Sequence, residues 1–320
     1  MAGVNGVRQP RGTAFALRDP LPWGAFAGIA ASGELLGYRA VFLPEITGRD
    51  TFAALAGLAG ETRELLLGTG IVPMTSRETL LTAMGAATVH ERSGGRLLLG
   101  LGTGAAVPGA LDRLREEVRA LRSLFAGEPV ERKGEAERLS LDPGSRVPIW
   151  ISALGPKAMR LAGEVADGVL LNWCPPERVA FARERVREGA EAVGRDAAQI
   201  VIAVYIRACV EQDDAAALAA MRAAAGQYAA FPAYARQFRA VGLGEEAAAA
   251  TAAHRAGDPD AVPERLVREA CLLGGRGQAL ERLAAYREAG ADLPVVYPVP
   301  AGEPAPSILG TLLALAPGTP

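Results

Sequence analysis

Short apolar runs alternate with amphipathic stretches along almost the whole chain. Eight runs have the length and composition of strands buried on both faces, and the stretches between them repeat apolar residues at helical spacing. The predicted strands cover residues 13–17, 39–43, 65–70, 97–102, 147–152, 168–172, 200–210 and 293–298. Strands that alternate with helices predict a parallel α/β sheet, and eight such units predict closure into a TIM-like (β/α)8 barrel. An open, doubly wound sheet is the structural alternative.

The pattern loosens in two places. Residues 127–144 are charged and rich in turn formers, which predicts a short hairpin or a surface excursion. Residues 223–275 form Ala-rich helical pieces broken by proline and glycine. We interpret this second segment as a helical insertion between strands 7 and 8, and residues 1–320 as a single barrel domain.

The residue pattern of the seventh strand predicts which of its two faces points into the barrel. Val201, Ala203, Tyr205 and Arg207 share one face by the two-residue period, and residues 200, 202, 204 and 206 form an all-aliphatic opposite face. The aliphatic face should meet the helices, so Tyr205 and Arg207 should face the barrel mouth. There the arginine would anchor an anion or a ring of the substrate; a plain core position is the alternative.

Composition excludes several classes of function. The net charge of −2 leaves no electrostatic footprint for nucleic acid, and no apolar run approaches the roughly 20 residues of a membrane span. The N-terminal residues lack the apolar segment of a signal peptide. Three widely spaced cysteines fit reduced thiols in the cytoplasm, and the two histidines, His90 and His254, lack metal-ligand spacing. We therefore expect a cytoplasmic protein without a metal site.

One glycine motif invites a different interpretation. Residues 100–105 match G-x-G-x-x-G/A after a strand and before a helix, as in a dinucleotide-binding fingerprint. However, no acidic residue ends a strand about 20 residues later, and the unit is fourth in the chain. Glycines that ease a barrel turn are the simpler explanation.

Barrel enzymes place their chemistry at the carboxyl ends of the strands. Glu45 follows the second strand, where it is either an acid–base or hydrogen-bonding group or a surface carboxylate. The turn from Ser152 to Lys157 opens a helix whose free N–H groups suit an anion, or it is an ordinary loop. Because no histidine lies near a strand end, and His90 suits a solvated or structural role, we expect a bound cofactor to supply the chemistry.

Several motifs together resemble the luciferase-like monooxygenase family, particularly its coenzyme F420-dependent oxidoreductases. No single motif is specific, but their order and spacing are, over roughly residues 15–317. They lie at residues 36–45, 48–50, 67–73, 93–104, 155–157, 161–163 and 166–168.

The resemblance implies a cofactor site. The third strand would end in a bulge with a non-prolyl cis peptide at Gly70-Ile71, which backs the middle ring of the deazaflavin. The turn from Ser152 to Lys157 would hold the cofactor phosphate. Hydride would then pass between the deazaflavin and a small-molecule substrate on its open face. The cofactor-binding residues expected are Thr69, Gly70, Ile71, Gly102, Thr103, Ser152, Ala153, Gly155, Pro156, Lys157 and Asn172, with Glu45 as the catalytic group beside the ring.

Two departures from the family pattern limit what the resemblance implies. Pro44-Glu45-Ile46 lacks the histidine that some members carry, and Ala105-Ala106 replaces a glutamate of others. Both argue against a sugar-phosphate dehydrogenase-like activity. An FMN-dependent monooxygenase on the same fold and a non-catalytic flavin- or deazaflavin-binding protein remain alternatives, and a homodimer is expected.

Overall fold

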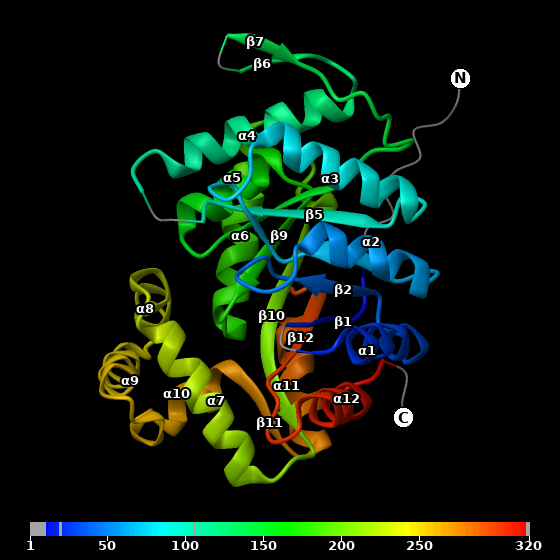
Figure 1. The fold of residues 1–320 in the computed structure, drawn as a ribbon. Helices are drawn as coiled ribbons and strands as arrows, with labels where there is room; N and C mark the ends of the chain where they lie inside the picture. The colour runs from blue at the N-terminus through cyan, green and yellow to red at the C-terminus, as the bar shows by residue number, and fades with distance from the viewer. Residues whose placement is uncertain (1–10, 19–20, 105–106, 133, 318–320) are drawn as a thin grey trace.

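A closed barrel of parallel strands forms the centre of the molecule (Figure 1). The computed structural model describes residues 11–18, 21–104, 107–132 and 134–317. The strands pair in the order β10, β12, β1, β2, β3, β5, β8 and β9, and β9 pairs with β10 again, which closes the sheet and rules out the open, doubly wound alternative. The barrel strands are β1 (Ala14–Ala16), β2 (Ala40–Leu43), β3 (Leu66–Thr69), β5 (Leu97–Gly102), β8 (Ile149–Ser152), β9 (Gly168–Asn172), β10 (Val201–Val210) and β12 (Leu293–Pro298). All eight predicted strands are confirmed.

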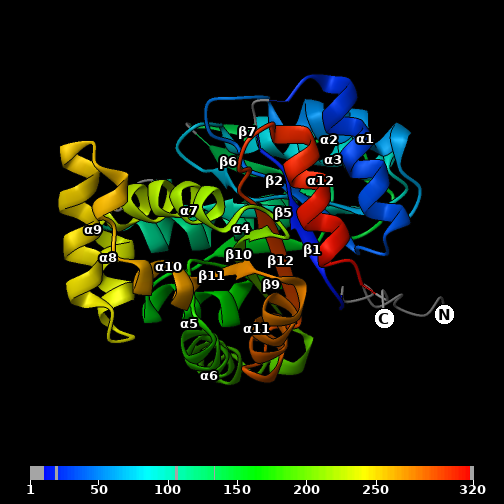
Figure 2. The ribbon, with the colours of Figure 1, turned by 90° about the horizontal axis from the view of Figure 1, so that it is seen from below.

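Helices surround the barrel on the outside, as Figures 1 and 2 show from two directions. Local signals set their ends: Asp50 accepts a hydrogen bond from the Ala53 N–H at 2.8 Å before α2, and Pro156 is the first residue of α5. Gly37, with φ of +86°, follows the C-terminus of α1. These helices are α1 (Trp23–Leu35), α2 (Thr51–Glu61), α3 (Thr79–Arg92), α4 (Ala110–Phe125), α5 (Pro156–Val165), α6 (Pro176–Ala192), α11 (Arg276–Glu288) and α12 (Pro304–Ala314).

The core has two layers, one inside the barrel and one between the strands and the helices. On β10, Ile202, Val204 and Ile206 pack in the outer layer, and Ala203 and Tyr205 pack in the inner one. The predicted division of this strand is therefore confirmed. It follows from the two-residue period of a strand buried on both faces.

The chain between β10 and β12 adds a helical layer on one side of the barrel, drawn from yellow-green to orange in Figures 1 and 2. It consists of α7 (Asp214–Ala229), α8 (Pro232–Arg239), α9 (Gly244–Ala256) and α10 (Glu264–Ala270), which share an apolar cluster around Phe238 and Met221. The helix expected after Asp213 continues unbroken into the predicted insertion, so the added layer begins at α7. It ends in β11 (Cys271–Gly274), an extra strand that pairs with β10 outside the barrel. The sequence pattern predicts only helices in this segment and misses the strand.

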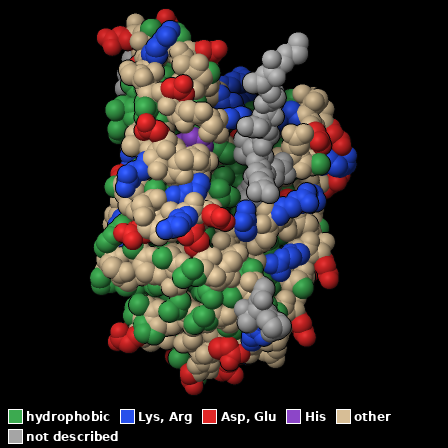
Figure 3. Space-filling model, turned by 90° about the vertical axis from the view of Figure 1, so that its right-hand side faces the viewer, with side chains coloured by type: hydrophobic (Ala, Val, Ile, Leu, Met, Phe, Trp, Pro, Cys, Tyr) green, Lys and Arg blue, Asp and Glu red, His purple; other side chains and the backbone are tan. Residues whose placement is uncertain are grey.

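Smaller elements complete the fold. The predicted excursion holds the hairpin of β6 (Val130–Arg132) and β7 (Glu135–Glu137), and a 3-10 turn (Ala197–Gln199) precedes β10. β4 (Val72–Pro73) pairs with β5 just after the interruption of β3. Among the described helices, none is both long enough and apolar enough to cross a membrane. Basic and acidic side chains lie next to one another on the face in Figure 3.

Candidate active site

A cavity of about 850 Å³ opens at the carboxyl ends of the barrel strands, with α7 and α8 on one side. Its volume is within the range of small-molecule and cofactor sites. The barrel closure brings eight of the predicted site residues to its lining although they are far apart in the chain. These are Glu45, Gly70, Ile71, Thr103, Ser152, Asn172, Tyr205 and Arg207.

The bulge predicted after the third strand is present, and the Gly70-Ile71 peptide bond is cis, as expected. The Gly70 N–H donates to the Leu43 carbonyl at 2.7 Å, and the Glu45 N–H donates to the Ile71 carbonyl at 3.3 Å. A Cβ at position 70 would lie 1.8 Å from the Tyr205 hydroxyl oxygen. Glycine is therefore required for the tyrosine to approach the bulge this closely.

Two predicted cofactor-binding residues lie behind the cavity wall and do not line it. The fully buried Thr69 hydroxyl donates to the Gly100 carbonyl and accepts from the Gly100 N–H, both at 2.7 Å, which ties β3 to β5. A Cβ at Gly102 would lie 2.5 Å from Ile71 Cδ1 and 2.8 Å from Ser152 Oγ. Thr69 and Gly102 thus shape the bulge and its neighbours, since their own side chains are occupied or absent.

The predicted phosphate turn is divided. Ser152 lines the cavity, and Ala153 is buried behind it, with its N–H donated to the Leu170 carbonyl at 3.1 Å. Gly155, Pro156 and Lys157 begin α5 outside the lining, and the lysine is exposed. An anion held by this helix N-terminus would therefore sit beside the cavity and not in it.

The Glu45 carboxylate is fixed by an arginine that the sequence patterns did not single out. Arg77 Nε donates to Glu45 Oε1 at 2.8 Å, and its Nη2 donates to Asp50. The bond to Glu45 is the largest of the effects that raise the pKa of Arg77, so the guanidinium keeps its charge. Glu45 Oε2 is buried without a partner in the described structure. Arg77 lies in the loop between β4 and α3, a segment with no periodic signal.

Arg207 lines the cavity and is surrounded by aromatic rings. Its side chain is 3% exposed, and its guanidinium carbon lies 4.1 Å from the ring centre of Tyr297 and 4.9 Å from those of Trp173 and Tyr228. Its Nη1 donates to Asn172 Oδ1. Aromatic faces attract a cation, and the attraction grows when water is excluded.

The helical insertion supplies a part of the site that sequence reasoning left unassigned. Asn172 Nδ2 donates to the Tyr234 hydroxyl at 2.7 Å, and Gln237 donates to the carbonyls of Asn172 and Trp173. Tyr228, Phe231 and Tyr234 line the cavity too. Three aromatic residues at three-residue spacing in an Ala-rich segment are the signal that could have found them.

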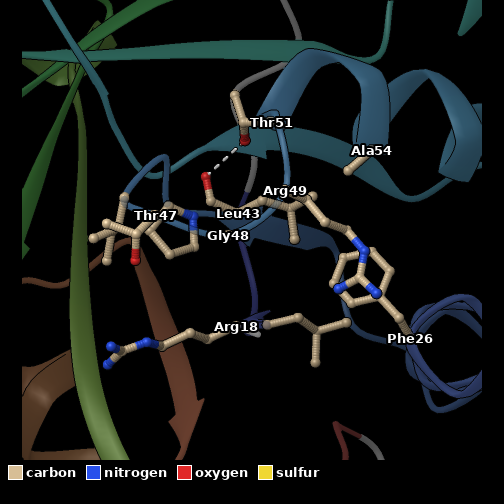
Figure 4. A pocket seen from close by; sticks show the side chains of 11 residues that line it. Arg18, Phe26, Leu43, Thr47, Gly48, Arg49, Thr51 and Ala54 are labelled. Atoms are coloured by element: carbon tan, nitrogen blue, oxygen red, sulfur yellow. Dashed lines mark hydrogen bonds between the residues drawn. The ribbon is translucent and has the colours of Figure 1, made fainter. Parts of the chain in front are cut away.

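A smaller cavity of about 230 Å³ adjoins the first and shares Arg18, Pro44 and Ile46 with it (Figure 4). The Thr51 hydroxyl donates to the Leu43 carbonyl at 3.1 Å across its inner wall, and Arg49 lies over the Phe26 ring at 4.7 Å. These contacts fix the loop that carries Glu45 between β2 and α2.

The cysteines, histidines and carboxylates in the part of the chain that the structure describes do not cluster as metal ligands. That part holds no group of three His, Cys, Asp or Glu residues that could bind a metal ion. Cys174, Cys209 and Cys271 are buried free thiols. His90 is buried, with Nε2 at 2.8 Å from Ser145 Oγ, so of the two roles considered it has the structural one.

The chain is similar in sequence to luciferase-like proteins along most of its length. The sequence profile of the luciferase-like monooxygenases matches residues 7–293. A 5,10-methylenetetrahydromethanopterin reductase of Methanolobus tindarius is 32% identical over 224 residues, 65% of this chain and 68% of that one. A putative coenzyme F420-dependent oxidoreductase of Mycobacterium tuberculosis is 28% identical over 319 residues, 86% of this chain and 92% of the relative.

Solved structures share the fold at low sequence identity. The coenzyme F420-dependent tetrahydromethanopterin reductase of Methanopyrus kandleri has a TM-score of 0.79 at 20% identity, over 96% of this chain and 98% of that one. The oxygenating constituent of the 3,6-diketocamphane monooxygenase of Pseudomonas putida, in complex with FMN, has a TM-score of 0.70 at 17% identity, over 96% and 97%. The chain therefore belongs to the luciferase-like monooxygenase family, which confirms the family and the oxidoreductase class expected from its motifs.

Proposed function

We propose that this protein is a coenzyme F420-dependent oxidoreductase that transfers a hydride between the deazaflavin and a small organic substrate. The observation that carries the proposal is the Gly70-Ile71 bulge, which lines a cavity large enough for a cofactor and a substrate and has no side chain at Gly70. The names of the related reductase and oxidoreductase support it.

The residues present fit such a group. The bulge would lie against the ring, Thr103 and Ser152 would border it, and α5 with Lys157 would hold the phosphate at the rim. When bound, the deazaflavin would supply a two-electron hydride carrier. The chain itself positions the reactants, excludes water with the aromatic residues of the insertion, and presents the Glu45 carboxylate, held by Arg77, to the ring or the substrate.

The test is a pair of titrations. We expect saturable binding of F420, followed by its absorbance and fluorescence, and no comparable binding of FMN. A Glu45→Gln variant, which keeps the size of the side chain, should still bind F420 but turn over slowly. Saturable binding of FMN with none of F420 would overturn the proposal.

An FMN-dependent monooxygenase is the second candidate, because a structural neighbour was solved with FMN. The titrations separate the two functions directly. A protein that binds F420 but leaves its redox state unchanged across a broad panel of alcohols, aldehydes and imines would instead fit the non-catalytic alternative.

The remaining expectations concern the localisation, the oligomeric state and the partners of the protein. We propose a cytoplasmic homodimer that takes a small molecule as substrate and binds no nucleic acid. Light scattering on the purified protein should give twice the chain mass of 33.2 kDa. A mass equal to that of one chain would contradict the dimer without affecting the proposed reaction.

A further inference from the structure

Arg207 is a buried charge without a counter-charge. Its side chain is 3% exposed, and no carboxylate in the described part of the chain lies within ion-pair distance of it. Buried charges in proteins are normally paired, since an unpaired one loses its hydration without compensation. A structural arginine would be expected to have such a partner, and this one faces the cavity instead.

The neighbours of Arg207 compensate its charge only in part. The faces of Trp173, Tyr228 and Tyr297 attract the cation, but aromatic faces are weak hydrogen-bond acceptors. A guanidinium carries five N–H donors in a planar fork, and the only hydrogen bond of its side chain within the described structure goes to Asn172. The remaining donors need an acceptor that the described residues do not provide.

Asn172 places a second donor beside this fork. Its Oδ1 must face the guanidinium, because an amide nitrogen there would meet only donors, so its Nδ2 faces Tyr234. The Tyr234 oxygen accepts that bond, which leaves the hydroxyl hydrogen for another acceptor. Burial raises the pKa of Tyr234 to about 12, so the hydroxyl keeps this hydrogen near neutral pH. Arg207 and Tyr234 are thus two donors held by one carboxamide at the same cavity.

The charges around the cavity also favour an anionic ligand. Arg18, Arg207 and Arg236 line it, and Glu45 is the only acidic residue among the described lining residues. Glu45 is already paired with Arg77. A cavity with a surplus of positive charge and low-dielectric aromatic walls concentrates anions.

We propose that Arg207 and Tyr234 bind a carboxylate or a similar oxyanion of the substrate, whose apolar body lies against Tyr228, Phe231 and Tyr297. The inference rests on the proposed function, because it takes the bound oxyanion to be part of a substrate. It narrows the proposed substrates to organic acids. The same oxyanion could come from the cofactor, which is itself anionic, so the experiment must separate the two sources. Planar apolar acids suit the aromatic walls best.

The first arm of the experiment uses the full-length protein without cofactor. Benzoate and its neutral isostere benzamide are titrated by calorimetry and by intrinsic tryptophan fluorescence, to which Trp173, whose ring lies against Arg207, contributes. We expect benzoate to bind at least about 10-fold more tightly than benzamide, the discrimination of one charge-assisted hydrogen bond. Equal affinity for the two probes would overturn the proposal.

Variants assign the binding to the two residues. Arg207→Met keeps an apolar stem among the rings and should reduce benzoate affinity by about 10- to 100-fold without changing benzamide binding. Arg239→Met, an exposed arginine of α8 outside the cavity lining, is the matched control for lost charge. If Arg207→Met fails to fold, Tyr234→Phe provides the test, with an expected loss of about 5- to 10-fold. Unchanged benzoate binding in a folded variant would overturn the assignment.

The second arm repeats the benzoate titration with saturating F420. Binding that persists alongside the cofactor supports a substrate site. Competition between benzoate and F420 would assign the donors to the cofactor and overturn the substrate class. If F420 itself does not bind, the proposed function fails, and the first arm still decides whether the anion site exists.

Discussion

At the scale of single residues, one hydroxyl group links packing to function. Tyr205 packs between Phe42 and Tyr297 inside the barrel mouth, and its oxygen touches the position where any other residue than Gly70 would place a Cβ. That oxygen is buried without a hydrogen-bond partner in the described structure. Leaving a buried hydroxyl unpaired costs about 1–3 kcal/mol, and a ligand that accepted its hydrogen bond would offset that cost.

Tyr205→Phe should therefore separate stability from function. We expect the free energy of unfolding to stay equal or to rise by up to about 1 kcal/mol, since the substitution removes an unpaired polar group and keeps the ring. Affinity for the cofactor or the turnover number should fall. Urea unfolding and steady-state kinetics measure the two effects. A clear loss of stability would show that the hydroxyl has a partner within the protein.

Lys157 is exposed and lies outside the cavity lining, so the contribution proposed for it is electrostatic. Lys157→Glu should weaken F420 binding through the phosphate, and the loss should be larger at low salt because exposed charges are screened. Fluorescence titrations at two ionic strengths measure it. Arg160→Glu, exposed one helical turn later on α5, is the control. A loss that does not change with salt would contradict this role for the lysine.

At the scale of elements, two glycines set the distance between α5 and α6. A Cβ at Gly163 would lie 2.1 Å from the Val186 carbonyl oxygen, and one at Gly189 would lie 2.0 Å from the Arg160 carbonyl oxygen. Both contacts are with backbone, which cannot rotate away as a side chain can. The close crossing explains why the motif at residues 161–163 ends in glycine, and it holds α5, the predicted phosphate helix, in place.

Gly189→Ala should destabilise the protein by about 1–3 kcal/mol, because the methyl group forces the two helices apart. Gly28→Ala on α1 is the matched control: no atom lies within 4 Å of its added Cβ, so alanine should stabilise that helix by up to about 1 kcal/mol. Chemical denaturation of both variants gives the comparison. Equal effects of the two substitutions would refute the crossing as the cause.

The end of α3 carries a pH-dependent contribution to stability. Burial lowers the pKa of His90, so the folded protein keeps this imidazole neutral while the unfolded chain takes up a proton below about pH 6.5. Stability should fall as the pH drops below that value, by at most about 1.4 kcal/mol per pH unit. His90→Gln should flatten the decline between pH 7 and 5.5, measured by urea unfolding, whereas His254→Gln at an exposed position should keep it. The same decline in both variants would assign it to other groups.

At the scale of the whole molecule, the site depends on the closure of the barrel and on the insertion packed beside it. The lining comes from the loop after β2 near one end of the chain, from β12 near the other, and from α7 and α8. A ligand that contacts all of these parts binds only the folded protein. Its binding energy then adds to the stability of the entire barrel.

F420 at 100 times its dissociation constant should therefore stabilise the protein by about 2.7 kcal/mol, which corresponds to a rise of about 4 °C in Tm. Differential scanning fluorimetry with increasing F420 measures the shift, and FMN at the same concentrations is the control. A rise in Tm with FMN and none with F420 would identify FMN as the cofactor in place of F420.

The sequence by itself predicted eight strands and favoured a barrel, and its family resemblance implied the cis bulge; the pairing of β10 with β9 and β12 decided the closure. Short continuous apolar runs predict strands buried on both faces, and the motif around Gly70 resembles that of the luciferase-like family. The two-residue period of β10 also assigned Tyr205 and Arg207 to the inner face, where Tyr205 packs and Arg207 lines the cavity.

Only the tertiary structure decided which residues share the cavity and which side chains they contact. Local patterns could not show that Thr69 and Gly102 lie behind the wall, that Arg77 reaches Glu45, or that Tyr234 meets Asn172. These contacts join residues at least 31 positions apart. They exist because the closed barrel brings strand ends together and the insertion packs over one edge, and no local propensity encodes either event.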